Sequence, residues 1–201
     1  MLSLLQHCGD WMYKFDLIYN KVMIDEGGYV SDPDDPGGET YKGISRVNNP
    51  KWAGWQIIDS YKGRYDFPKC LQADENLEEL VKYLYKKKYY DPYIGDQIDD
   101  SIAEEMFDQA VNLGIERAIE HLQRSLNVLN RNQRDYSDIQ VDGIFGQNTL
   151  KALLKCESVR GTKLLFNVLN GYQVKRYIEL MEKDAFKEKY IGWFNRIEIK
   201  K

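Results

Sequence analysis

A glycine pair at the end of an apolar helical stripe is the feature that most constrains the fold of this chain. Apolar residues recur at the spacing of one face of an amphipathic helix. They are Phe15, Ile18, Tyr19, Val22 and Met23. Gly27 and Gly28 follow, and glycine ends helices because it tolerates positive φ and has no Cβ. The pattern predicts a helix from about Trp11 to Glu26.

Glu26 falls on the apolar face of this predicted helix. It lies eleven residues after Phe15, which at ~100° per residue brings it back to within roughly 20° of Phe15. Burial without a cation raises the pKa of a carboxyl group. A carboxyl that keeps its proton can donate it to a leaving group, as the general acid does in glycosidic cleavage. The simpler alternative is an exposed glutamate at the end of an ordinary helix.

Residues 32–38 form a turn cluster with two prolines, two glycines and three aspartates. One interpretation is a rigid surface turn in which aspartates cap backbone N–H groups. An EF-hand loop is excluded because Pro36 and Gly43 occupy positions that should hold ligands. A third interpretation places the second carboxylate here. Asp35 follows Glu26 by nine residues, and the Thr40 hydroxyl could orient a water molecule. Asp32 and Asp34 compete with Asp35 for this role.

The pattern E-G-G-Y-x-x-D-P-x-D-x-G-G-x-T-x-x-G-I, which runs from Glu26 to Ile44, resembles the signature of glycoside hydrolase family 108. That family consists of N-acetylmuramidases, found as phage endolysins and as bacterial proteins described as secretion activators. The resemblance implies a mainly α, lysozyme-like fold and makes Glu26 the catalytic acid. The order of Glu26, Asp35 and Thr40 also resembles that of phage lysozymes. Lys42 departs from the expected small polar or aromatic pair, which bears on substrate contacts.

Later motifs extend the resemblance. Residues 107–114 look like a helix that follows the catalytic region of the family, and residues 192–196 match its closing G-W-x-N-R. Residues 141–150 are similar to the D-G-x-x-G-x-x-T element of peptidoglycan-binding modules. We therefore expect an N-terminal extension over 1–13, a catalytic region over 14–100, and a helical peptidoglycan-binding-like region over 101–201. We expect the last two to pack as one body, with a small loop and strand region after the first helix.

Aromatic side chains can stack on sugar rings, and the chain has 15 tyrosines and 4 tryptophans. Tyr29 and Tyr41 flank the candidate acid and its loop, and Trp52 or Trp55 follows. We predict Tyr29, Tyr41 and Trp52 as substrate-binding residues, with core packing as the general alternative.

Composition excludes several classes of protein. The net charge of −4 argues against nucleic-acid binding, and no run of 18 apolar residues predicts a membrane span. Two distant histidines and the lack of zinc-ligand spacing predict no metal and no cofactor. Three widely spaced cysteines and the absence of a recognisable signal predict synthesis in the cytoplasm. Action at the cell wall or periplasm then requires a holin, a secretion apparatus or lysis.

Helical patterns dominate the rest of the chain. We expect Asp74 to begin a helix that runs to about Tyr89, and Ser101 with Glu104 to form a capping box. Further helices are expected over 115–130, from 146 to about 157, and over 162–183. His121 is predicted at a helix surface or core edge. Asp108 with Asn112 is predicted to have a structural hydrogen-bonding role, and Asp142 to cap a turn at Gly143.

The sequence therefore favours a muramidase that cleaves the β-1,4 bond between N-acetylmuramic acid and N-acetylglucosamine in peptidoglycan glycan strands. Two alternatives remain open at this point. One is a lytic transglycosylase, and the other is a non-enzymatic peptidoglycan-binding or secretion-activating protein. The anomeric outcome and the oligomeric state do not follow from the sequence.

Overall fold

The computed structural model describes residues 14–23, 27–31, 38–183 and 187–197. These residues are mainly α-helical, with one small sheet after the first helix, which confirms the predicted fold class. The chain divides into two compact units. We call residues 16–88 the strand-bearing unit and residues 1–15 with 89–201 the helical unit. Among the described helices, none is both long and apolar enough to span a bilayer.

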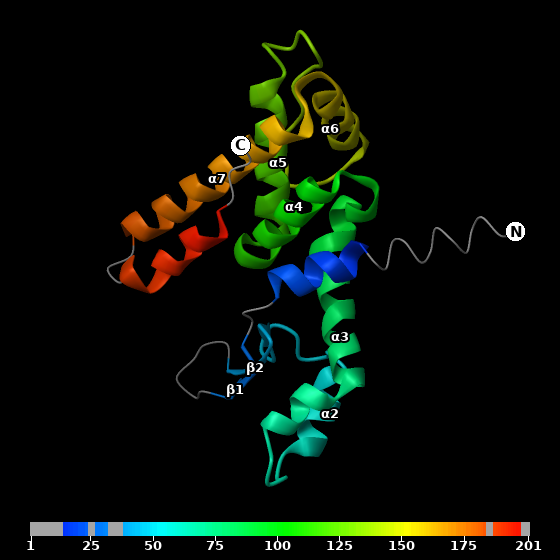
Figure 1. Cartoon of the computed structure of the whole chain (residues 1–201), viewed down its shortest axis with the longest axis vertical. Helices are drawn as coiled ribbons and strands as arrows, with labels where there is room; N and C mark the ends of the chain where they lie inside the picture. Colours follow the sequence, from blue (N-terminus) through cyan, green and yellow to red (C-terminus); the bar gives the residue numbers. More distant parts are fainter. Residues whose placement is uncertain (1–13, 24–26, 32–37, 184–186, 198–201) are drawn as a thin grey trace, which may run out of the picture. The chain divides into compact units, whose positions relative to one another are not determined.

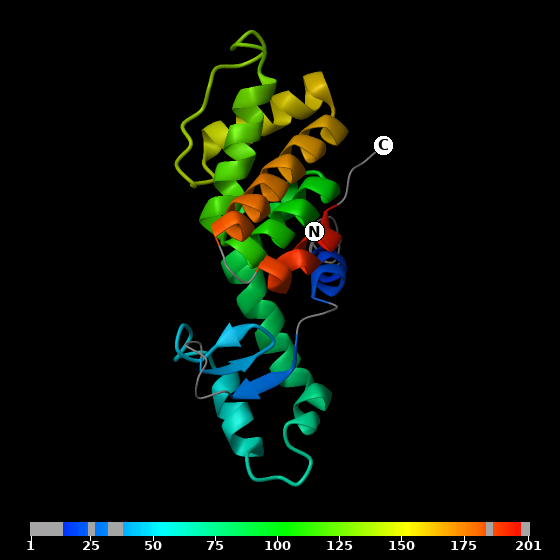
Figure 2. The same cartoon turned by 90° about the vertical axis from the view of Figure 1, so that its left-hand side faces the viewer.

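The strand-bearing unit is built around a three-stranded antiparallel sheet (Figure 2). Strand β1 (Tyr29–Ser31) pairs with β2 (Glu39–Tyr41), and β2 pairs with β3 (Ile44–Ser45). In this register Thr40 lies between Val30 and Ser45. The prediction of strand-like residues after the first helix is thus confirmed.

Helices α2 (Gly54–Tyr61), η1 (Lys69–Ala73) and α3 (Glu75–Tyr85) also belong to this unit. Helix α3 begins as expected, since the Asp74 side chain accepts a hydrogen bond from the backbone N–H of Leu77 at 2.9 Å. The core combines sheet and helix side chains, all of them at most 2% exposed. They are Tyr41, Ile44, Trp55, Ile58, Leu71, Leu77 and Val81. The sheet is therefore held by its contacts with a helical core.

The helical unit contains four helices of 14 to 22 residues (Figure 1). They are α4 (Asp100–Leu113), α5 (Ile115–Leu129), α6 (Gln147–Arg160) and α7 (Thr162–Lys183), followed by η5 (Lys187–Arg196). Helices α5 and α7 each pack against the other three, so together they hold the unit. Gly114 separates α4 from α5 at a φ of 90°, a conformation that glycine adopts without strain.

Two helix boundaries differ from the sequence prediction. Asp99, not Ser101, is the N-cap of α4, because its carboxylate accepts hydrogen bonds from both the backbone N–H and the hydroxyl of Ser101. The predicted capping box is therefore wrong, and the helix begins at Asp100. Helix α3 ends at Tyr85 and continues as the π-helical turn η2 (Lys86–Tyr90) before the 3₁₀ turns η3 (Asp91–Tyr93) and η4 (Gly95–Gln97).

Candidate functional site

The predicted catalytic pair Glu26 and Asp35 lies outside the described residues, as do the competing Asp32 and Asp34. The described part of the candidate site is the sheet that flanks them in sequence. Thr40 is half-buried at the centre of β2, and its hydroxyl donates to the Gly38 carbonyl oxygen at 3.5 Å. Gly38 has a φ of 60°, which favours glycine at this position.

Tyr29 is one of two predicted sugar contacts that the structure leaves half-buried, the other being Trp52. Tyr29 lies on β1 opposite Tyr41, and its ring packs edge-on against Phe67 with centroids 4.8 Å apart. Partial burial, with a hydrogen bond to Glu39, raises the pKa of its hydroxyl. The phenol therefore stays protonated and can act as a hydrogen-bond donor.

Tyr41 and Trp52 are engaged in packing. Tyr41 is 2% exposed, its hydroxyl donates to the Leu71 carbonyl oxygen at 3.4 Å, and burial raises its pKa to about 12. Trp52 stacks against Tyr41 and meets Trp55 edge-on. Its indole N–H donates to the Leu80 carbonyl oxygen at 3.3 Å. Tyr41 is thus enclosed in the core, while Trp52 remains half-buried.

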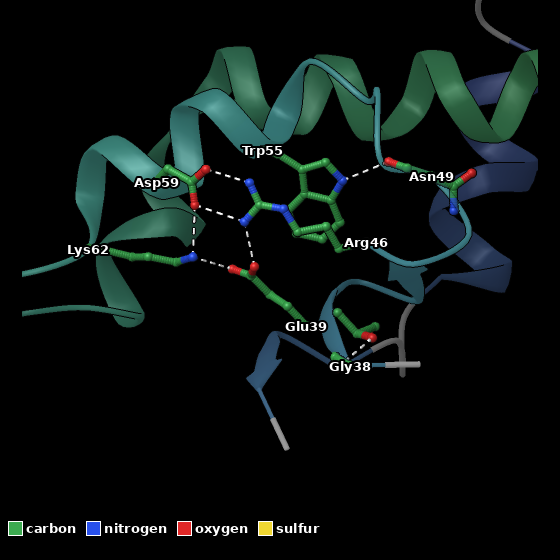
Figure 3. Close-up of polar contacts among 8 residues, drawn as sticks. Gly38, Glu39, Arg46, Asn49, Trp55, Asp59 and Lys62 are labelled. Carbon is green, nitrogen blue, oxygen red and sulfur yellow. Dashed lines mark hydrogen bonds and ion pairs between the residues drawn. The ribbon is translucent and has the colours of Figure 1, made fainter. Parts of the chain in front are cut away.

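Four charged side chains join strand β2 to helix α2, and we call them the charged clasp (Figure 3). They are Glu39, Arg46, Asp59 and Lys62. The Arg46 guanidinium donates to Glu39 at 2.5 Å and to both carboxylate oxygens of Asp59, at 2.9 and 2.5 Å. Lys62 contacts Glu39 and Asp59, each at 2.7 Å. Two cations thus meet two carboxylates, and the charges balance.

The clasp keeps both carboxylates ionised. Burial acts to raise the pKa of Glu39, but hydrogen bonds from Lys62 and Arg46 outweigh it and the pKa is lowered. The hydrogen bonds from Arg46 and Lys62 hold the pKa of Asp59 well below its usual range. Glu39 directly precedes Thr40, so the clasp fixes the strand that carries the candidate water-orienting hydroxyl. No sequence pattern indicated this arrangement, because its members are up to 23 residues apart.

Lys42, the departure from the family pattern, has an internal partner. Its ammonium contacts Glu78 at 2.5 Å, and its backbone carbonyl accepts from the Tyr85 hydroxyl at 2.8 Å. The Tyr19 hydroxyl also donates to Glu78, at 3.2 Å. Glu78 and Tyr85 both belong to α3, so this helix holds the turn between β2 and β3, where Lys42 adopts a φ of 43°. In the described structure Lys42 therefore stabilises the turn between β2 and β3.

The helical unit contains a buried carboxyl group that the sequence analysis did not single out. Glu105 is 5% exposed, and burial raises its pKa to about 7. Its carboxylate accepts from the Gln109 side chain at 2.7 Å. Glu105 comes three residues after Ile102 and four before Gln109, which puts it on the buried face of α4. This spacing is the sequence feature that could have predicted its burial. Glu105 lies in packed helix contacts of α4, and no described cavity is lined by it.

Two predicted structural roles are observed in the helical unit. Asn112 donates to the backbone oxygen and carboxylate of Asp108 at 2.7 and 3.0 Å, and Gln173 donates to the same carboxylate at 2.6 Å. Asp142 accepts from the Ile144 backbone N–H at 2.9 Å, which caps the turn. Both agree with the structural interpretation of these residues.

Gln123 holds the Asp142 turn, and we call this contact the amide clasp. Its Nε2 donates to Asp142, to the Ile144 carbonyl oxygen and to Thr149, at 2.8, 3.0 and 3.2 Å. Its Oε1 accepts from the backbone N–H groups of Asp142 and Gly143, both at 3.0 Å. One buried amide thus makes five contacts to the D-G-x-x-G-x-x-T element.

The described residues contain no cluster of three or more His, Cys, Asp or Glu side chains suited to a metal ion. Within the same residues, Cys70 and Cys156 are free thiols, and burial raises the pKa of Cys156. The predictions of no metal and no cofactor stay predictions.

Comparison with known proteins agrees with the motifs. Residues 19–114 match the family described as "Glycosyl hydrolase 108", and residues 117–198 match the family described as "Predicted Peptidoglycan domain". No curated protein matches the chain. Among solved structures, "Structure of Brucella abortus SagA" is similar in fold, with a TM-score of 0.57 and 23% identity. The match covers 91% of this chain and 88% of that one.

The two matched families together account for most of the chain, and their order agrees with the order of the sequence motifs. They support a peptidoglycan-directed glycoside hydrolase with a peptidoglycan-binding region. The chain therefore belongs, over residues 19–114, to the glycosyl hydrolase 108 family, followed over residues 117–198 by a peptidoglycan domain.

Proposed function

We propose that this protein is an N-acetylmuramidase, which hydrolyses the β-1,4 bond between N-acetylmuramic acid and N-acetylglucosamine in peptidoglycan. The observation that supports this most is the glycosyl hydrolase 108 match over residues 19–114, which includes the complete motif from Glu26 to Ile44. The peptidoglycan domain that follows supports the same substrate.

In this proposal Glu26 is the general acid and gives its proton to the leaving glycosidic oxygen. Asp35 is the second carboxylate, which either stabilises the oxocarbenium ion or activates water. Thr40 orients that water. Its place on β2, beside the charged clasp, gives the hydroxyl a rigid backbone, which supports the assignment. Tyr29 is the proposed sugar-contacting residue, while Tyr41 and Trp52 stay predictions.

The decisive test is Glu26→Gln, which keeps the shape of the side chain and removes its proton. We expect a loss of at least about 100-fold in the rate of cell-wall clearing, with thermal unfolding unchanged. Glu79→Gln is the matched control, because Glu79 is an exposed carboxylate on α3 in the same unit. A folded Glu26→Gln variant that clears wall at the normal rate would refute the assignment.

Product analysis separates hydrolysis from the transglycosylase alternative. A muramidase adds one water to each product, whereas a lytic transglycosylase leaves 1,6-anhydro ends that are lighter by one water. Mass spectra of digested wall therefore decide between them. Asp35→Asn should also reduce the rate, and an unimpaired variant would move the second role to Asp32 or Asp34.

The peptidoglycan domain favours wall binding as an accompanying function. A purely binding protein would retain insoluble peptidoglycan without releasing soluble fragments, which the same assay measures. Export through a holin or a secretion apparatus stays a prediction.

A further inference from the structure

A polar cavity of about 320 Å³ lies between helices α5 and α7 of the helical unit. Arg117, His121 and Arg124 come from α5, and Tyr172, Arg176 and Glu179 from α7. None of these residues belongs to the predicted catalytic machinery or to the motifs that identified the family. The cavity therefore needs its own explanation.

Positive charge in this cavity exceeds the negative charge that faces it. Its lining holds three arginines and Lys175 against a single carboxylate, Glu179. Glu179 is shared, lying 3.6 Å from Arg176 and 3.8 Å from Lys175. Arg117 pairs with Glu120 on its own helix at 2.6 Å. Arg124 forms no ion pair with any residue that the structure describes. This excess of positive charge favours binding of a carboxylate, which arginine can hold through two parallel hydrogen bonds.

His121 is a buried acceptor at the base of the cavity, since only 5% of it is exposed. Its Nδ1 lies 2.7 Å from the Gln109 Oε1. The Gln109 amide is oriented by its Nε2, which donates to Glu105 and to the Leu169 carbonyl oxygen. Its Oε1 must therefore accept, so His121 carries its proton on Nδ1. The other ring nitrogen, Nε2, has no hydrogen-bond partner among the described residues, so its lone pair is open to a donor.

Burial and nearby positive charge keep this imidazole neutral. Burial comes first, and the charges of Arg117 and Arg124 add to it, so the pKa of His121 is lowered to about 4. Tyr172 stacks on the ring with centroids 5.7 Å apart. At neutral pH the cavity thus offers guanidinium donors for a carboxylate. It also offers two acceptors, His121 Nε2 and Glu179, for N–H groups.

We propose that this cavity binds a carboxylate-bearing peptide, namely the stem peptide of peptidoglycan. Stem peptides combine free carboxylates with amide or ammonium N–H groups, which match the donors and acceptors above. A simple phosphate ester supplies negative charge but no N–H group to pair with His121. The inference rests on the proposed function only in taking peptidoglycan as the substrate.

The test measures the dissociation constant of the full chain for a synthetic stem tetrapeptide by isothermal titration calorimetry. Arg124→Gln and Arg176→Gln should each weaken binding by about tenfold or more, since each removes a charged donor. Arg134→Gln is the matched control, because Arg134 is an exposed arginine outside the cavity. The same peptide with its carboxylates amidated should bind at least about tenfold more weakly to the unchanged chain.

Several outcomes would overturn the proposal. They are equal binding of the amidated peptide, unchanged affinity in both cavity variants, or displacement of the peptide by inorganic phosphate at matching concentration. The assay needs no turnover, so it is run in parallel with the Glu26→Gln chain. If that chain still clears wall, the muramidase proposal fails. The measured peptide affinity tests the cavity proposal separately. Thermal unfolding of Arg124→Gln checks that its fold is intact; this residue has no ion pair to lose among the described residues.

Discussion

The charged clasp and the amide clasp both join a strand or turn to a helix, the first through ion pairs and the second through a neutral amide. In the strand-bearing unit, Arg46 and Lys62 tie strand β2 to helix α2 through ion pairs that remain partly exposed. In the helical unit, Gln123 ties the Asp142 turn to helix α5 through a neutral amide that is 1% exposed. The ionised groups of the charged clasp stay in contact with water, whereas the buried side chain of the amide clasp is neutral, because desolvating an ion is costly.

The cavity between α5 and α7 adds a third case to the comparison. There the cations are partly exposed, as in the charged clasp, but they outnumber the nearby carboxylates. Balanced charges hold the backbone in place, while an excess leaves donors for a ligand. Exposure alone would not distinguish the two regions, whereas charge balance does.

The largest expected effect tests the amide clasp. Gln123→Ala removes five hydrogen bonds and leaves the backbone N–H groups of Asp142 and Gly143 unpaired. We expect a loss of stability on the order of 4 kcal/mol, together with faster hydrogen exchange at those two amides. Gln147→Ala is the control, because this glutamine is exposed at the start of α6. Unchanged exchange at Asp142 and Gly143 would show that the turn holds itself.

The next effect tests the buried polar network of the helical unit through pH. The pKa of Glu105 rises from 4.5 to about 7 on burial, so the folded chain keeps a proton that the unfolded chain releases. Its contribution to stability is complete below the unfolded pKa and is lost as the pH rises through about 7. Glu105→Gln should match the unchanged chain at pH 4. At pH 8 the variant should be more stable than the unchanged chain by on the order of 3 kcal/mol.

His121 gives the opposite slope, since its lowered pKa makes stability fall as the pH drops below 6.5 toward about 4. Both chains share this slope, so the difference between their urea-unfolding free energies isolates Glu105. A difference that does not change with pH would rule out a buried proton at position 105.

The smallest effect tests the charged clasp. Arg46→Gln should lower stability by about 1–2 kcal/mol, because Glu39 keeps Lys62 as a partner and Asp59 is already partly hydrated. The lowered pKa values of Glu39 and Asp59 make the clasp effective above about pH 4, and its contribution is lost as the pH falls further.

Arg64→Gln is its control, because the ion pair of Arg64 is a local one with Asp66, two residues away and outside the clasp. In 1 M salt the effect of Arg46→Gln should shrink, since ions screen exposed charges, while the effect of Gln123→Ala should persist. Equal salt sensitivity of the two would remove the distinction between the clasps.

The sequence predicted local elements well where the signal itself is local. The Asp74 cap, the Gly114 boundary and the Asp142 turn each depend on residues within a few positions, and each is observed. The Ser101 capping box was wrong because Asp99, two residues earlier, competes for the same N–H and hydroxyl groups. A local sequence pattern does not show which of two neighbouring residues will be the N-cap when both can bind the same donor groups.

In the candidate site, too, the sequence predicted local features and missed contacts between residues that are distant along the chain. The motif from Glu26 to Ile44 assigned roles to its own residues, and of these the structure places Thr40 on strand β2. The clasp beside it joins Glu39 to Asp59, which no spacing in the motif suggests. Tyr41 looked like a sugar contact from its position but is buried, because the small sheet turns that side chain into the helical core.

By itself, the sequence determined the helical class, the sheet after the first helix and the family, since hydrophobic period, glycine turns and motif letters are properties of neighbouring residues. Only the tertiary structure decided which charges are balanced and which polar groups are buried. Glu105, Gln109 and His121 form one network, and Arg124 stands without an ion pair among the described residues, because packing of α4, α5 and α7 sets the environment of each group. Burial and charge balance depend on distant neighbours, and distance along the chain does not encode them.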